Sequence, residues 1–392
     1  MNNESYRDTW TEISLSAIYE NTHTFKNHIS KRTKLMAVVK ADGYGHGAVE
    51  VSNTALKAGA DYLGVAILDE AIALREAGIS APILVLGYTP IRSIETAVQN
   101  NISLTVYSME VLKKVNTISS KLNKITKIHI KVDTGMGRVG VTSKEEALSL
   151  AEMAEEAPYV HLEGLFTHFA NADSNDDNYT DQQFSSFQNV IRYLKNHHIE
   201  IPIKHCCNSA ATICNQNMHL DMVRVGISLY GLYPSNDVKN TGFPLKQAMH
   251  FKTKVSAVKQ VPAGRMISYG CTFSTDKTTN IATIPVGYAD GLSRLLSNKG
   301  QFLIKNKQVP IIGRICMDQT MLDVTHLPTI DTETEVTIFG SSDTSFISID
   351  EVADHMGTIN YEVVCLIGKR VPRVYLKTAG RKPLTNANAV LV

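Results

Sequence analysis

Short hydrophobic runs recur along about the first 240 residues of the chain, and segments with helical spacing separate them. The runs are Leu35–Val39, Tyr62–Ile67, Ile83–Gly87, Ser103–Tyr107, Ile128–Val132, Leu162–His168, Ile203–Cys207 and Val223–Leu229. The segments between them, such as residues 48–60 and 144–157, repeat apolar positions every three or four residues, as the buried face of a helix does. Eight strands that alternate with helices predict an α/β fold of the (β/α)8 TIM-like barrel type.

The pattern changes character after Gly242. From His250 onward the hydrophobic runs are short, rich in β-branched residues and separated by turn residues, which is typical of β-strands. We therefore expect two domains, an N-terminal barrel at residues 1–242 and a C-terminal, mainly-β domain at residues 243–392.

Lys40 is the first candidate for chemistry. It follows the apolar run Leu35–Val39 and precedes a loop with Gly43, Gly45 and Gly47, and barrel enzymes gather their catalytic groups at the carboxyl ends of the strands. Partial desolvation at an apolar strand end favours the neutral amine, which can attack a carbonyl carbon to form a Schiff base. A solvated lysine at the end of an edge strand would give the same local pattern. Residues elsewhere in the chain are therefore needed to distinguish a reactive lysine from a solvated one.

Further candidate residues stand on or after later predicted strands, at the same rim of the barrel. They are Lys131 and Arg138 after the fifth strand, His168 at the end of the sixth, Asn208 and Ser209 after the seventh, and Arg224, Gly226 and Ile227 on or after the eighth. Phosphate sites in barrels favour the loops after the last two strands. Ser209, Gly226 and Ile227 are thus candidate phosphate contacts, although a helix cap at Ser209 or a plain turn at Gly226 would look the same in isolation.

Composition and charge give no sign of a nucleic acid or membrane partner. The 392 residues carry 39 basic and 38 acidic side chains, a formal net charge of +1. No apolar run approaches the roughly 20 residues that a membrane span needs, and the polar start of the chain lacks the features of a signal peptide. The six cysteines form no CxxC pair, and His205 beside Cys206 and Cys207 offers poor ligand geometry. We expect a cytoplasmic protein with reduced thiols and no metal site.

Nine segments of the chain resemble, in order, segments of the alanine racemase family, whose members use pyridoxal 5'-phosphate. They are residues 37–47, 131–140, 164–173, 208–212, 223–231, 267–270, 286–291, 313–319 and 359–365. This resemblance covers most of the chain. It implies an isomerase that interconverts L-alanine and D-alanine for cell-wall peptidoglycan, and a homodimer whose subunits share the active site. It also implies that the segment around Trp10–Ser14 pairs as a strand with the second domain.

The resemblance assigns the two catalytic bases. Lys40 would bind the cofactor and serve one face of the substrate, and Tyr269 from the second subunit would serve the other face. A tyrosine has a reference pKa near 10, so it needs tuning to act as a base near neutral pH, and His168 and Arg224 would provide this tuning. Packing at an interface is the ordinary role of such a tyrosine.

In the family, the position of Arg224 faces the pyridine nitrogen of the cofactor. A guanidinium donates hydrogen bonds but does not give up its proton, so the ring would stay unprotonated. An acidic residue at this position would protonate the ring, make it a stronger electron sink and favour reactions such as decarboxylation.

The remaining roles also follow from the resemblance. His168, Asn208, Ser209, Gly226 and Ile227 would contact the cofactor, Tyr44 and Tyr361 would reach its phosphate, and Tyr288 and Tyr361 would narrow the entrance. Arg138 and the backbone of Met317 would meet the substrate. Lys131 would be carbamylated and hold Arg138 through its negative charge.

Three alternatives stay open. A racemase of broader specificity would need a larger pocket. A barrel-type decarboxylase that uses the same cofactor would carry an acidic residue in place of Arg224. A non-enzymatic cofactor-binding barrel would lack the second domain and Tyr269.

Overall fold

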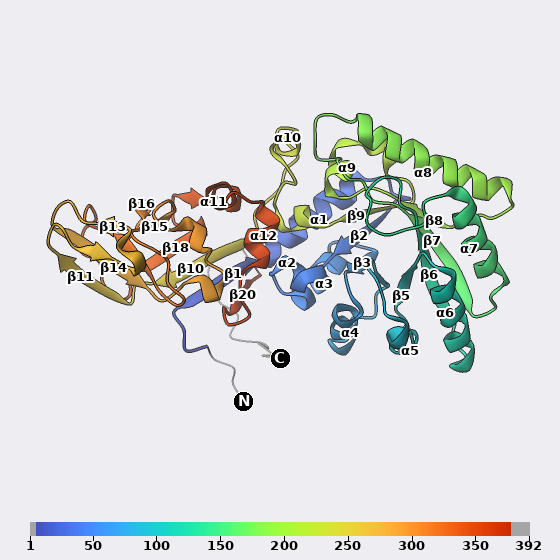
Figure 1. The fold of residues 1–392 in the computed structure, drawn as a ribbon, viewed down its shortest axis with the longest axis horizontal. Helices are drawn as coiled ribbons and strands as arrows, with labels where there is room; N and C mark the ends of the chain where they lie inside the picture. The colour runs from blue at the N-terminus through green and yellow to red at the C-terminus, as the bar shows by residue number, and fades with distance from the viewer. Residues whose placement is uncertain (1–4, 378–392) are drawn as a thin grey trace. The chain divides into compact units, whose positions relative to one another are not determined.

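The computed structural model describes residues 5–377, which form two compact units (Figure 1). The barrel unit comprises residues 18–43 and 47–246, and the β unit comprises residues 5–17, 44–46 and 247–377. The first strand of the chain thus belongs to the β unit. Within residues 5–377, no helix has the length and apolar character of a membrane span.

Eight parallel strands form the sheet of the barrel unit. They are β2 (Lys34–Val38), β3 (Tyr62–Val65), β4 (Ile83–Val85), β5 (Ser103–Val106), β6 (Thr126–Lys131), β7 (Val160–Phe166), β8 (Ile203–His205) and β9 (Met222–Val225). The order is β8-β7-β6-β5-β4-β3-β2-β9. Backbone hydrogen bonds from Asp221 N to Lys204 O and from Arg224 N to Cys207 O, both 3.1 Å, link the two ends. The predicted barrel fold is confirmed.

Helices surround these strands on the outside (Figure 1). The helices of this part of the chain, apart from the short α2 described below, are α1 (Leu15–His28), α3 (Ala48–Lys57), α4 (Leu68–Glu76), α5 (Ile94–Gln99), α6 (Met109–Lys121), α7 (Lys144–Glu156), α8 (Asn178–Asn196), α9 (Ser209–Cys214) and α10 (Asn236–Lys239). The start of α7 shows how the sequence begins such a helix. Ser143 Oγ accepts a hydrogen bond from Glu146 N, and the Glu146 carboxylate accepts one from Ser143 N, which together form a reciprocal cap. Its residues Ala147, Leu150 and Ala151 are buried, as the spacing predicts.

The β unit is built around a seven-stranded sheet. Its members are β1 (Thr9–Ser14), β10 (Met249–Lys254), β15 (Gln301–Ile304), β16 (Lys307–Pro310), β18 (Glu335–Ser341), β19 (Phe346–Ile347) and β20 (Arg373–Leu376). The order is β16-β15-β18-β10-β1-β20, with β19 paired to β18. Strand β1 runs antiparallel to β10 and parallel to β20, so segments near both ends of residues 5–377 lie in one sheet.

Smaller elements complete this unit. They are the sheet of β11 (Ala257–Val261), β14 (Thr279–Ile284) and β17 (Thr320–Asp323), the hairpin of β12 (Met266–Ile267) and β13 (Phe273–Ser274), and the helices α11 (Ile349–Met356) and α12 (Asn360–Cys365). The mainly-β prediction is confirmed. The two helices were not anticipated, although Ile349, Val352 and Met356 have helical spacing and are buried.

Candidate active site

Lys40 begins a left-handed turn that follows β2 and is labelled α2 (Lys40–Tyr44). Ala41, Asp42 and Gly43 have φ of 52°, 51° and 59°, a conformation that costs an L-residue about 1–2 kcal/mol. One long-range and one local hydrogen bond hold the turn: Ala41 N donates to Glu70 Oε1 on α4 at 2.6 Å, and Gly43 N donates to Val39 O at 2.9 Å. The lysine therefore leaves the barrel strand in a fixed direction.

Arg224 on β9 is buried, with 4% of its surface exposed. Its guanidinium donates to His205 Nδ1 at 3.0 Å, to Thr167 O at 2.9 Å, to Cys206 O at 3.0 Å and to His168 Nδ1 at 3.1 Å. All four acceptors are neutral, because burial and then the nearby Arg224 charge hold the pKa of both histidines well below the ordinary value. Burial lowers the pKa of Arg224 to about 10, so the side chain stays cationic at neutral pH.

Lys131 ends strand β6 and is also buried, with 3% of its surface exposed. Its Nζ has no hydrogen-bond partner in the described part of the chain and lies 4.7 Å from the centroid of the Phe166 ring. The Cζ atom of Arg224 lies 5.4 Å from the same centroid. Burial, followed by the charges of Arg224 and Arg138, holds the pKa of Lys131 well below its ordinary value. Burial and the neighbouring cations thus disfavour the protonated form of Lys131.

The candidate phosphate contacts lie together after β8 and β9. Gly226 N donates to Ser209 Oγ at 2.9 Å, and Ile227, which is buried, follows directly and begins a 3-10 turn. Asn208 caps α9, since its Oδ1 accepts from Ala211 N at 3.0 Å. These contacts join the two loops in which barrels commonly hold a phosphate.

Arg138 is exposed in the loop after β6. Asp133 shapes this loop, because its carboxylate accepts from the backbone N–H groups of Gly135, Gly137 and Arg138 at 2.9–3.1 Å. The charge of Arg138 contributes to the lowered pKa of both Lys131 and His168. The barrel unit thus gathers one set of predicted site residues at the carboxyl ends of its strands: Lys40, Lys131, Arg138, His168, Asn208, Ser209, Arg224, Gly226 and Ile227.

The remaining predicted site residues belong to the β unit. Tyr44 is buried there, and its ring centroid lies 6.2 Å from that of Tyr361 on α12. Gly45 makes this approach possible, because a Cβ atom at Gly45 would lie 2.2 Å from Val364 O. The two tyrosines predicted to reach a phosphate are therefore neighbours.

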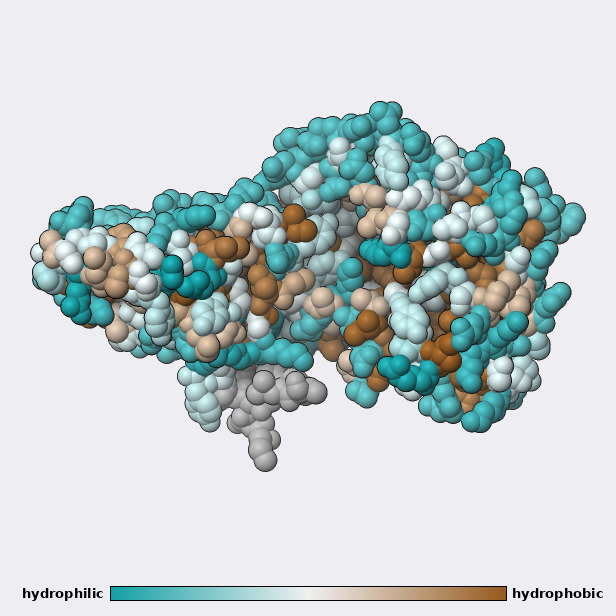
Figure 2. All heavy atoms as spheres, viewed as in Figure 1, coloured by the Kyte–Doolittle hydropathy of each residue, from teal (hydrophilic) through white to brown (hydrophobic). Residues whose placement is uncertain are grey.

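Tyr269, Tyr288 and Met317 lie on adjoining backbone segments of the β unit. Tyr288 N donates to Cys316 O at 3.1 Å, and Ser268 Oγ donates to Arg314 O at 2.5 Å. The three side chains are 70%, 43% and 52% exposed. The β unit thus presents them on its surface, and Figure 2 shows that hydrophobic residues reach the drawn face of this unit among hydrophilic ones.

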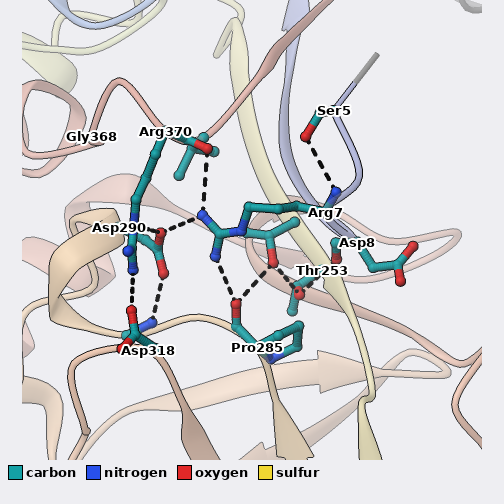
Figure 3. Close-up of polar contacts among 12 residues, drawn as sticks. Ser5, Arg7, Asp8, Thr253, Pro285, Asp290, Asp318, Gly368 and Arg370 are labelled. Atoms are coloured by element: carbon teal, nitrogen blue, oxygen red, sulfur yellow. Dashed lines mark hydrogen bonds and ion pairs between the residues drawn. The ribbon is translucent and has the colours of Figure 1, made fainter.

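A group of ion pairs supports these segments (Figure 3). Asp290, whose side chain is fully buried, accepts from Arg7 Nη1 at 2.6 Å, from Arg370 Nε at 2.7 Å and from Gly287 N at 3.0 Å. Arg370 also contacts Asp318 at 2.6 Å. These ion pairs were not predicted from the sequence, although Asp290 and Asp318 stand within the segments 286–291 and 313–319 that resemble the family.

Three further residues of the barrel interior were also missed as site residues. Glu163, His129 and His205 are buried on β7, β6 and β8, and only His205 was considered, as a metal ligand. Titratable residues inside apolar strand runs were the signal in the sequence that could have found them.

The turn that begins at Lys40, the residues at the carboxyl ends of the barrel strands and the mainly-β unit define an enzyme class in which a (β/α)8 barrel is joined to a β domain. Residues 13–234 match the family model described as alanine racemase, N-terminal domain, and residues 248–375 match alanine racemase, C-terminal domain. The chain belongs to the alanine racemase family, a family of isomerases.

Individual relatives agree with this assignment. Alanine racemase 2 of Oceanobacillus iheyensis is 55% identical over 95% of this chain and 94% of its own. A crystal structure of alanine racemase from Bacillus anthracis with bound L-Ala-P is 41% identical, with a TM-score of 0.92 and coverage of 97% of both chains. A histidine racemase from Leuconostoc mesenteroides has the same fold, with a TM-score of 0.88, 29% identity, and coverage of 96% of this chain and 100% of its own.

Proposed function

We propose that the protein is a pyridoxal-phosphate-dependent alanine racemase that interconverts L-alanine and D-alanine and so supplies D-alanine for peptidoglycan. The observation that carries the proposal is the buried Arg224, a cation whose described acceptors are all neutral and which makes no ion pair within residues 5–377. A neutral pyridine nitrogen accepts a hydrogen bond from such a donor without taking its proton.

The residues around Arg224 fit this cofactor. Lys40 supplies an amine on the same rim, and the loops of Ser209 and Gly226 supply small residues and backbone amides for a phosphate. Tyr44 and Tyr361 would add hydroxyl donors to the phosphate. When bound, pyridoxal phosphate supplies an aldehyde carbon that links to amines and a ring that withdraws electrons from the substrate Cα.

The side chains of the protein move the proton. In the proposed mechanism Lys40 Nζ takes the Cα proton from one face of the substrate and returns it there, and Tyr269 from a second copy of the chain does so on the other face. The exposure of Tyr269, together with exposed Tyr288, Met317 and Leu366, supports a surface that a second copy covers.

Substrate binding would fall to Arg138 and to the backbone of Met317, which meet the carboxylate. The lowered pKa of Lys131 and its unpartnered Nζ support its carbamylation, in which the neutral amine attacks carbon dioxide, forms an N–C bond and releases a proton. The resulting anion would pair with the cationic Arg138.

The proposed barrel domain at residues 1–242 would thus hold the cofactor, and the proposed domain at residues 243–392 would supply Tyr269. We place the enzyme in the cytoplasm, where its six cysteines, all free thiols in the structure, would stay reduced.

Because a histidine racemase is among the structural relatives, a racemase of broader specificity is the second candidate function. The decarboxylase alternative is disfavoured because Arg224, and not an acidic residue, occupies the position expected to face the pyridine nitrogen.

Two measurements test the proposal. Incubation of the purified protein with L-alanine and, separately, L-histidine, followed by chiral chromatography, should yield D-alanine at the higher rate. Borohydride should fix the cofactor to the peptide that contains Lys40, and the Lys40→Ala variant should lose this label, whereas Lys57→Ala, a lysine on outer helix α3, should keep it. Faster formation of D-histidine, or the label on another lysine, would contradict the proposal.

A further inference from the structure

A continuous row of hydrogen bonds crosses the interior of the barrel and ends at Arg224. Glu163 Oε2 contacts His129 Nε2 at 3.1 Å, His129 Nδ1 contacts His205 Nε2 at 2.9 Å, and His205 Nδ1 contacts Arg224 Nη1 at 3.0 Å. His129 on β6 and His205 on β8 belong to strands that β7 separates in the sheet. Their contact therefore lies inside the barrel, where both imidazoles are fully buried.

The far end of the row is a carboxylate with three side-chain donors. Glu163 also accepts from the Tyr62 hydroxyl through Oε2 and from Lys127 Nζ through Oε1, the latter at 2.6 Å. Burial alone would raise the pKa of Glu163, but the hydrogen bonds from His129, Lys127 and Tyr62 outweigh it and hold the pKa well below the ordinary value. Burial also lowers the pKa of His129 and His205. The row thus consists of an ionised carboxylate, two neutral imidazoles and a guanidinium.

Only one arrangement of protons satisfies every contact in such a row. A carboxylate only accepts hydrogen bonds, and a guanidinium only donates them. A neutral imidazole donates through one ring nitrogen and accepts through the other. His129 must therefore carry its proton on Nε2 and donate to Glu163, which leaves Nδ1 to accept from His205. His205 must in turn carry its proton on Nε2, which leaves Nδ1 to accept from Arg224. The opposite order would set an N–H group of His205 against an N–H group of Arg224.

The packing around the two imidazoles holds them in this row. The His205 ring stacks on Phe166, with centroids 4.7 Å apart and planes 3° apart. The His129 ring lies directly against Gly164, where an added Cβ atom would approach His129 Nδ1 to 2.1 Å. Neither ring therefore has room to turn over without displacing its neighbour.

We propose that Glu163 is a positioning residue that orders the tautomers of His129 and His205 and thereby presents a hydrogen-bond acceptor to Arg224. The effect on the cofactor rests on the proposed function, because Arg224 is the group expected to face the pyridine nitrogen. The tautomer order itself does not depend on that function and is measurable in the full-length protein whether or not it racemises alanine.

The experiment is solid-state ¹⁵N NMR of the full-length protein labelled at histidine and arginine, with signals assigned by loss in the His129→Asn and His205→Asn variants. The wild type should show Nε2–H, neutral tautomers at both positions. Glu163→Met, which removes the acceptor, should change the tautomer population of His129 and speed hydrogen exchange at the Arg224 Nη groups at least about fivefold.

Two variants test whether the effect comes from the hydrogen-bond acceptor at Glu163 or from the charge and packing around it. Glu163→Gln keeps a carbonyl that can accept from His129, and should retain the wild-type tautomers. Lys127→Met removes the half-exposed cation at the outer oxygen and should leave both histidine signals unchanged. An Nδ1–H tautomer at either histidine in the wild type, or unchanged spectra and exchange in Glu163→Met, would overturn the proposal. A protein that shows the expected tautomers but forms no D-alanine would instead contradict only the proposed function.

Discussion

Ala41 holds a left-handed backbone conformation beside Lys40, although it is not a glycine and its side chain is exposed. The conformation costs alanine about 1–2 kcal/mol, whereas glycine adopts it readily and loses about 0.5–1 kcal/mol through backbone entropy. Ala41→Gly should therefore raise the free energy of unfolding by up to about 1.5 kcal/mol, measured by urea denaturation.

Ala73 provides the matched control. It is exposed like Ala41 but lies inside the right-handed helix α4, where the same substitution should lower the free energy of unfolding by about 0.5–1 kcal/mol. Equal losses in the two variants would mean that the turn after Lys40 stores no strain.

At the scale of elements, Asp290 joins the N-terminal segment, the Tyr288 turn and the segment of Arg370. Burial would raise the pKa of Asp290, but hydrogen bonds from Arg7, Arg370 and Gly287 outweigh it and lower the pKa. A carboxyl whose pKa is lower in the folded state stabilises the protein above its unfolded pKa, near 4, and this contribution is lost as the pH falls through the folded pKa.

Asp290→Asn should lower the free energy of unfolding at pH 7 by about 1–3 kcal/mol, and the variant should lose less further stability than the wild type when the pH falls below about 4. Asp318→Asn is the control, because Asp318 is 59% exposed in its contact with Arg370 and should cost less than about 1 kcal/mol. Urea titrations at pH 7 and pH 3.5 measure both effects. Identical acid sensitivity of the wild type and Asp290→Asn would rule out this role of the carboxylate.

The sequence predicted the barrel because each strand run and each helical segment carries its own local pattern. The same reasoning placed Lys40, His168 and Arg224 at one rim, since strand ends define the rim. It could not predict the contact of His129 with His205 or of Arg7 with Asp290, because these pairs are 76 and 283 residues apart and depend on strand register. Helix α12 was missed because its six residues are too few to show a period.

At the scale of the whole molecule, the proposed active site needs residues from two chains. Lys40→Ala and Tyr269→Phe should each be nearly inactive, since racemisation needs a base on both faces of the substrate. Subunit exchange between the two variants should restore about a quarter of the wild-type activity. This value assumes that half of the dimers are mixed and that each mixed dimer has one intact site of two.

The control is a mixture of Lys40→Ala with a tagged copy of the same variant, which should exchange subunits but stay inactive. If mass measurement confirms exchange between Lys40→Ala and Tyr269→Phe and no activity returns, Tyr269 acts within its own chain or is not the second base.

The placement of β1 between β10 and β20 has a consequence for synthesis on the ribosome. Strand β1 is translated before the barrel strands, but β10 begins at Met249 and β20 ends at Leu376. While the intervening barrel residues are translated, β1 therefore has neither of its sheet partners and exposes two unpaired edges. The barrel can form from the sequence between β1 and β10, so the nascent chain carries an unpaired β1 strand until β10 appears, and one edge of β1 stays open until β20 is made.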